Sequence, residues 1–257
     1  MANTSIRVTP DSALLACDGG VIELRTVFLG GISRGAAIVL CDVGDLDTAA
    51  GDAMNRLAEH GYESVAAQLD PAAEDDALLS RVEVLVDHLG RRGWLRAQIG
   101  LLGFGVGGRA VLLASAVRPL GVAVAMWPSG VFGNGAAGAP PVSARTPLLV
   151  LVAGADPGCD AAQVHRYARM LDAASPASTE VIRYAQVTSG FAHDALEGPA
   201  HAAAFEAWQR TIETFDGHVA PRPTPLAQVW ATRNPHPDSE VLDLIGGRSA
   251  TDVDLVD

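Results

Sequence analysis

The segment "LLGFGVGGRA" (residues 101–110) contains four glycines, and the spacing of three of them allows two interpretations. Gly103, Gly105 and Gly108 form the pattern G-x-G-x-x-G after an apolar run, which is typical of a loop that holds the phosphates of a dinucleotide. The same letters are also typical of a sharp turn between a strand and a helix that presents a nucleophilic side chain. In that second interpretation, glycine stands at the position of the nucleophile. The rest of the sequence decides between the two.

Length and composition indicate one large domain, alone or with an extension. The chain has 257 residues, of which 49% are hydrophobic, and no apolar stretch approaches the ~18 residues that span a membrane. The opening "MANTSIRVTP" lacks the features of a secretion signal. Cys17, Cys41 and Cys159 lie far apart without a CxxC pair, which argues against a disulfide framework or a zinc knuckle. We therefore expect a cytoplasmic protein that does not bind membranes.

The charge of the chain excludes several classes of function. Its formal net charge is −12 and the sequence shows no basic stripe, so we expect no nucleic-acid partner. All 18 basic residues are arginine. The lack of lysine excludes Schiff-base chemistry, attachment of pyridoxal phosphate and the lysine of a Walker motif. We expect no cofactor.

Strand-like and helix-like segments alternate along residues 1–217, which we predict to form one domain. Repeated strand-then-helix order predicts an α/β fold with a mostly parallel central sheet flanked by helices. The expected strands are 21–30, 36–44, 63–70, 97–105, 121–130, 147–156 and 178–187, and the expected helices are 47–62, 76–93, 108–117, 161–174 and about 199–215.

The composition changes after residue 217. Five prolines lie between Pro221 and Pro237, and the end of the chain is acidic. We expect residues 218–257 to form an irregular, Pro-rich C-terminal arm with a short helix near 238–245. Such an arm packs on the body of the protein or on a partner, and a homo-oligomer formed through it is one possibility.

The dinucleotide interpretation of 101–110 does not satisfy two requirements. In a dinucleotide fold the glycine loop belongs to the first strand–helix unit, and an acidic residue about 20 residues later holds the ribose. Here about three strands precede the loop, and the next strand, 121–130, ends without a carboxylate. This argues against a dinucleotide site.

The strand–turn–helix interpretation is supported by residues further along the chain. Enzymes built on such an elbow place an acid after a later strand and a histidine after the last strand. In this chain the segment "LVLVAGADPG" places Asp156 at the end of the strand two past the elbow. His193 lies in "YAQVTSGFAHDA", after the last strand and before a helix that begins near Pro199. Both the order and the spacing agree with that arrangement.

The chain resembles dienelactone hydrolases, members of the α/β-hydrolase superfamily, over about residues 20–216. The matching segments are "CDVGDLD", "LAEHGYESVAAQL", "GFGVGG", "AGADP" and "SGFAHD…AFEAWQRTIETF". The resemblance implies an α/β-hydrolase fold with a site at the carboxyl ends of the strands.

The resemblance also implies roles for single residues, and two of them are lost here. The cysteine or serine nucleophile of the family falls on Gly105, and its acid falls on Asp156. The histidine of the family usually stands directly before Gly-Phe, where this chain has Ser189. His193 falls where some members hold a substrate carboxylate with arginine.

Other family positions map to the loop after the second expected strand and to the elbow. The oxyanion hole, made of backbone N–H groups, would map to Val43 and Val106, and a glutamate beside the hole maps to Asp42. Together with Gly105 and Ser189, these are candidate ligand-binding positions.

The missing groups argue against ester hydrolysis by the usual triad. Covalent acyl transfer needs a nucleophile within reach of a base, and neither Gly105 nor Ser189 supplies one near neutral pH. Backbone donors with one acid/base group suffice for cyclisation, isomerisation or elimination. We nominate His193 as base and Asp156 as the group that orients it. The alternative is that His193 is a surface loop residue.

Three hypotheses remain open. The first is a non-hydrolytic enzyme, such as a cyclase, isomerase or lyase, that acts on a small apolar substrate. The second is a catalytically silent pseudo-hydrolase that binds a ligand or a partner protein. The third is a hydrolase whose triad is rebuilt from unexpected residues.

Several further side chains are weaker candidates for contact with a ligand. Ser129 ends a strand at the edge of the site and is a candidate ligand contact. Cys159 either presents a thiol or fills space, and Cys41 lies in an apolar strand. Trp127 either lines a pocket or fills core, as do Trp208 and Trp230.

We expect no metal site. Asp42, Asp45 and Asp47 are not followed by a calcium-type loop and favour a solvated turn with a helix cap. His193 and His201 lack the i, i+4 spacing of a helical zinc pair.

Overall fold

The computed structural model describes residues 7–17, 20–132, 140–194, 198–223 and 225–233. The chain divides into two compact units, residues 1–220 and 221–257. The first unit contains the sheet. The described part of the second contains one helix, α7 (Pro225–Arg233). How the C-terminal arm packs stays a prediction, as does any oligomer formed through it.

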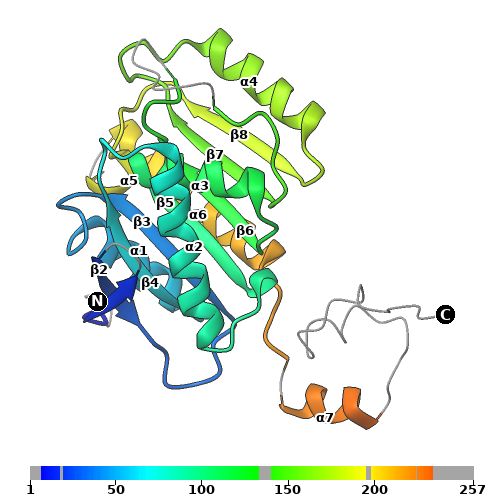
Figure 1. Cartoon of the computed structure of the whole chain (residues 1–257). Coiled ribbons are helices and arrows are strands. Elements are labelled where there is room, and N and C mark those ends of the chain that lie inside the picture. Colours follow the sequence, from blue (N-terminus) through cyan, green and yellow to red (C-terminus); the bar gives the residue numbers. More distant parts are fainter. Residues whose placement is uncertain (1–6, 18–19, 133–139, 195–197, 224, 234–257) are drawn as a thin grey trace. The chain divides into compact units, whose positions relative to one another are not determined.

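The first unit is built on an eight-stranded sheet with the order β1-β2-β4-β3-β5-β6-β7-β8 (Figure 1). The two antiparallel pairs are β1 with β2 and β2 with β4, and every later pair is parallel. The strands are β1 (Asp11–Cys17), β2 (Gly20–Val27), β3 (Gly35–Asp42), β4 (Tyr62–Leu69), β5 (Ile99–Phe104), β6 (Val122–Met126), β7 (Leu148–Ala153) and β8 (Thr179–Tyr184).

Helices cover both faces of the sheet (Figure 1). Side chains of α2, α3 and α4 pack into the core on one face, and those of α1 and α6 pack on the other. The helices of the first unit are α1 (Ala49–Glu59), α2 (Asp75–Arg91), α3 (Val106–Val117), α4 (Ala161–Ala174), the short α5 (Phe191–Asp194) and α6 (Gly198–His218). A 3₁₀ turn at Arg96–Gln98 leads into β5.

The burial of the central strands explains their composition. The strand β3 has the sequence GAAIVLCD, and all of it except Asp42 is buried. The strands β5, β6 and β7 are buried along their whole length. A strand covered by helices on both faces needs a continuous apolar run rather than alternation. The polar exception, Asp42, is therefore placed where the strand leaves the core.

The structure confirms the predicted α/β fold with a mostly parallel sheet flanked by helices. It differs from the expected elements at both ends of the chain. The strand β1, which the sequence did not predict, forms a hairpin with β2, so four strands rather than three precede the glycine turn.

The C-terminal arm also differs from the expectation. Residues Pro225–Arg233 are helical rather than irregular, because Pro225 stands at the first helical position, where proline is tolerated. The expected helix near 238–245 lies outside the described residues.

Close backbone contacts fix the start of α3 against the sheet. A Cβ atom added to Gly103 would lie 2.2 Å from the carbonyl oxygen of Gly107. A Cβ atom added to Gly107 would lie 2.2 Å from the carbonyl oxygen of Leu40 on β3. Only glycine permits this approach of helix to strand. The turn at Gly105 is thereby held between β3 and β5.

We predict that Gly107→Ala destabilises the protein and that Gly90→Ala does not. Gly90 lies near the exposed end of α2, where an added Cβ meets nothing within 4 Å, so alanine should stabilise the helix by up to about 1 kcal/mol. At residue 107 the new atom collides with backbone, and we expect a loss of roughly 1–3 kcal/mol or more. Urea unfolding measures both. A Gly107→Ala protein as stable as the parent would show that the contact with Leu40 does not fix the turn.

Candidate active site

The candidate site lies at the point in the sheet where the order of strand addition reverses, which is at β3. From β3 the chain passes through α1 to β4 on one side, and then returns through α2 to β5 on the other side of β3. Ligands of open α/β sheets bind at such switch points, beyond the carboxyl ends of the strands. Leu40 pairs with Gly103 in the parallel register. Asp42 and Gly105, each two residues further along, therefore lie beside each other.

Gly105 forms a tight, strained turn between β5 and α3. Its backbone has φ 55° and ψ −118°, a combination that side chains other than that of glycine rarely permit. The Gly105 N–H donates to the carbonyl oxygen of Met126 over 3.3 Å, and the Gly105 carbonyl accepts from the N–H of Ser129 over 2.9 Å. This confirms the expected strand–turn–helix elbow.

The carboxylate of Asp42 occupies the space above this turn. Its Oδ1 accepts a hydrogen bond from the backbone N–H of Val106 over 2.8 Å. A Cβ atom built on Gly105 would lie 2.3 Å from Oδ2 and 2.7 Å from Oδ1 of Asp42. A side chain at residue 105 therefore requires the Asp42 carboxylate to move from this position.

The surroundings of Asp42 favour its protonated form. Burial of the carboxyl group raises its pKa above the ordinary value, the hydrogen bond from Val106 opposes that rise, and the negative charge of Asp45 adds to it. A carboxyl group whose pKa is raised in this way is suited to both accepting and donating a proton.

A cavity of about 540 Å³ opens beside Gly105. The loops after β3, β5, β6 and β7, and the segment after β8, contribute its walls. Six of the eight candidate catalytic and ligand-binding residues line this cavity, namely Asp42, Gly105, Ser129, Asp156, Ser189 and His193. Val43 and Val106 are not among its lining residues.

One wall of the cavity is aromatic and holds the imidazole of His193. The His193 ring packs edge-on against Phe104, with ring centroids 4.4 Å apart, and against Trp127, with centroids 5.0 Å apart. Trp127 has φ 37°, a positive value that is unusual for a residue other than glycine. The ring of Trp127 also stacks on Phe104 at 5.5 Å. His193 is thus half-buried at the cavity wall rather than at the outer surface.

Asp156 holds the loop that carries Ser189. Its Oδ1 accepts from the Ser189 N–H over 2.8 Å, and its Oδ2 accepts from the Ser189 hydroxyl. Both carboxylate oxygens therefore have a partner in the loop after β8. The orientation of His193 by Asp156, which the sequence suggested, stays a prediction.

The two positions expected to supply an oxyanion hole differ in their surroundings. Val43 follows Asp42 and its side chain is exposed. The N–H of Val106 donates to the Asp42 carboxylate. Their roles as ligand contacts also stay predictions.

Sequence reasoning left several wall residues undecided or unnamed. The structure places Trp127 on the cavity wall and buries Trp208 in the core, whereas Trp230 is exposed. Phe104 had no signal in the sequence beyond its place next to Gly105. Cys159 lines the cavity, and Cys41 is fully buried.

The acidic residues after β3 have separate surroundings. The backbone carbonyl of Asp45 accepts from Thr48 and Ala50 at the start of α1, and Asp47 forms an ion pair with Arg25. No group of three or more metal-ligating side chains occurs in the part of the chain that the structure describes. Likewise, none of the described helices is both long and apolar enough to cross a membrane.

Known structures share this fold. A candidate dienelactone hydrolase from Klebsiella pneumoniae matches 81% of the chain and 98% of its own length, with 21% identity and a TM-score of 0.69. A dienelactone hydrolase-like promiscuous phosphotriesterase from metagenomic libraries matches with 18% identity and a TM-score of 0.64, over 82% of this chain and 98% of its own. An esterase from Pyrobaculum calidifontis matches 81% of this chain and 85% of its own, with 17% identity and a TM-score of 0.61. None of the curated proteins compared with the chain matches it.

The sheet order, the elbow at Gly105 and these neighbours define an α/β-hydrolase fold. The family model for the dienelactone hydrolase family matches residues 58–219. The chain belongs to the dienelactone hydrolase family.

The raised pKa of Asp42 predicts how stability depends on pH. A carboxyl group with a higher pKa in the folded than in the unfolded state binds its proton more tightly when folded, so the free energy of unfolding falls as pH rises between the two pKa values. Asp42→Asn removes this loss and can still accept from Val106. We expect the stability of Asp42→Asn relative to the parent to increase as pH rises from about 4 and then to level off.

Urea unfolding at a series of pH values measures this difference. Asp87→Asn, at an exposed position of α2, is the matched control and should show a difference that changes little with pH. A relative stability of Asp42→Asn that falls as pH rises would show that the folded protein favours the ionised form.

Proposed function

We propose that this member of the dienelactone hydrolase family is a non-hydrolytic acid/base enzyme, a cyclase, isomerase or lyase, that acts on a small molecule in the cavity beside Gly105. Asp42 and His193 are the groups that move protons. Asp156 and Ser189 bond to each other and position the segment after β8, which also carries His193. The Asp156 carboxylate acts through that segment, as a positioning residue.

The observation that carries the proposal is the position of the Asp42 carboxylate. It fills the space in which a side chain at residue 105 would begin, and it takes the N–H of Val106. Covalent hydrolysis needs both a nucleophile at the elbow and a free backbone donor for the oxyanion. Here a single carboxylate replaces both, and it faces the cavity.

Asp42 and His193 complement each other as proton-transfer groups. An imidazole titrates near neutral pH, and the carboxyl of Asp42 is half-buried in surroundings that favour its neutral form. Both line the same cavity, whose aromatic wall limits access of water to the imidazole. Removal of a proton from one atom of a substrate and its delivery to another requires two such groups and no covalent intermediate.

Ester hydrolysis tests the negative half of the proposal. We expect the parent protein to hydrolyse p-nitrophenyl acetate no faster than the surface variant Asp87→Asn and to form no adduct with a fluorophosphonate probe, as measured by intact mass. Gly105→Ser should gain no esterase activity and should be less stable, because the new Cβ meets Asp42. The double variant Gly105→Ser/Asp42→Ala should recover part of that stability.

A fluorophosphonate adduct on Ser129 or Ser189 would contradict the proposal and would indicate a rebuilt triad instead.

Proton exchange tests the positive half. Abstraction of a proton next to a carbonyl begins many cyclisations, isomerisations and eliminations, and a positioned acid/base group contributes about 10²- to 10⁴-fold to such a step. We expect the protein to accelerate exchange of the α-protons of phenylacetone in D₂O, monitored by NMR. Asp42→Asn and His193→Phe should each remove most of this acceleration, since phenylalanine keeps the packing against Phe104 and Trp127. Exchange by these variants at the parent rate would contradict the proposed roles of Asp42 and His193 and would favour the pseudo-hydrolase hypothesis.

A further inference from the structure

We infer that the cavity beside Gly105 selects its ligand by charge: it accepts organic cations and neutral molecules and rejects carboxylates and other anions. The inference rests on the proposed function, from which it takes the location of the site, and it adds the class of substrate. Selection by charge does not depend on which type of reaction the site performs.

The described walls of the cavity carry three acidic side chains, those of Asp42, Asp45 and Asp156. Among the described residues that line it, the only side chain able to carry a positive charge is that of His193. An anion placed in this cavity lies near the carboxylates of Asp45 and Asp156 with no permanent cation to offset them, and Asp42 adds to their charge when it is ionised. A positively charged group has carboxylates to pair with.

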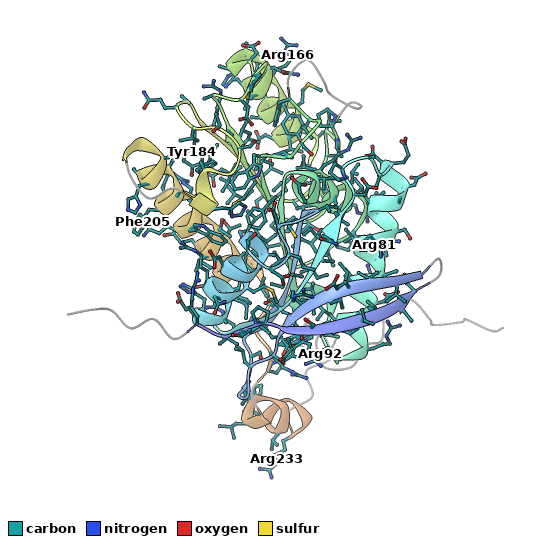
Figure 2. All side chains as sticks on the ribbon, turned by 90° about the vertical axis from the view of Figure 1, so that its left-hand side faces the viewer. Arg81, Arg92, Arg166, Tyr184, Phe205 and Arg233 are labelled. Carbon is teal, nitrogen blue, oxygen red and sulfur yellow. The ribbon has the colours of Figure 1, made fainter. Side chains whose placement is uncertain are left out.

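Two arginines of the first unit, one on α3 and one on β8, have a partner that does not line the cavity. Arg109 on α3 forms an ion pair with Asp75. Arg183 on β8 donates to the backbone carbonyl oxygen of Gly154. Neither lines the cavity. Other arginines lie on the outer surface, such as Arg166 on α4, whose side chain points away from the body (Figure 2).

The rest of the sequence supplies no obvious cation to the walls. The chain contains no lysine, and segments 133–139 and 194–197, which adjoin wall residues in the sequence, contain no arginine. The net charge of −12 adds a long-range field of the same sign as the walls.

Two aromatic rings give the cavity an apolar wall. Trp127 and Phe104 stack beside each other there, and both are almost fully buried. A cavity that combines carboxylates with an apolar wall suits a protonated amine attached to an apolar body.

Three probes of matched size and shape test the inference at pH 7: benzylamine as its ammonium ion, benzyl alcohol and benzoate. Titrations monitored by protein NMR measure each dissociation constant. We expect benzylammonium to bind more tightly than benzyl alcohol, and at least about tenfold more tightly than benzoate. Shifts should centre on Trp127 and His193. Benzoate binding as tightly as benzylammonium, or no detectable binding of benzylammonium, would overturn the inference.

Matched variants locate the source of the selectivity. Asp45→Asn removes one wall charge and keeps the backbone bonds that the Asp45 carbonyl accepts, so it should narrow the difference between benzylammonium and benzoate. Asp87→Asn makes the same change of net charge on exposed α2 and should leave the difference unchanged. Equal effects of the two variants would assign any preference to net charge and not to the cavity.

Failure of this inference is distinguishable from failure of the proposed function. Preferred binding of benzoate would leave the proton-exchange result untouched. Absence of proton exchange would contradict the proposed function, but it would not change the measured order in which benzylammonium, benzyl alcohol and benzoate bind.

Discussion

The carboxylate of Asp42 and a Cβ atom at residue 105 compete for one volume, and the function that we propose depends on this competition. Because residue 105 is glycine, the carboxylate reaches the N–H of Val106 at 2.8 Å. The same bond holds Asp42 over the turn, at a depth where burial raises the pKa of its carboxyl group. In the function that we propose, this carboxyl group transfers protons at the elbow, and no nucleophile at residue 105 takes part.

The surrounding fold makes this local exchange possible without loss of architecture. The glycines at 103 and 107 keep the start of α3 close to β5 and β3, which holds the elbow against the sheet. The chain remains a member of the dienelactone hydrolase family, and the cavity remains at the switch point of the sheet. Structural likeness at 21% identity or less establishes the fold, while the chemistry must be argued from the side chains at that point.

Much of the fold was predictable from the sequence because the buried strands have continuous apolar runs and the helices have amphipathic spacing. The strand β1 escaped prediction because it is an edge strand in which only Leu15 is buried and Leu14 is exposed. The sequence placed Asp42 beside the site, but its contact with Gly105 depends on the pairing of Leu40 with Gly103, which are distant in the sequence. Sequence patterns within one segment do not predict which residues of two distant strands pair with each other. The engagement of both Asp156 oxygens by Ser189 was equally inaccessible.

The most direct test is the titration of the Asp42 carboxyl group by ¹³C NMR, assigned by comparison with Asp42→Asn. We predict a midpoint above the ordinary range for aspartate, which is about 4. The amide proton of Val106 should shift with the same midpoint, because that N–H donates to the carboxylate. A midpoint at or below the ordinary range, with a Val106 amide that does not respond, would show that Asp42 does not occupy the place of the nucleophile.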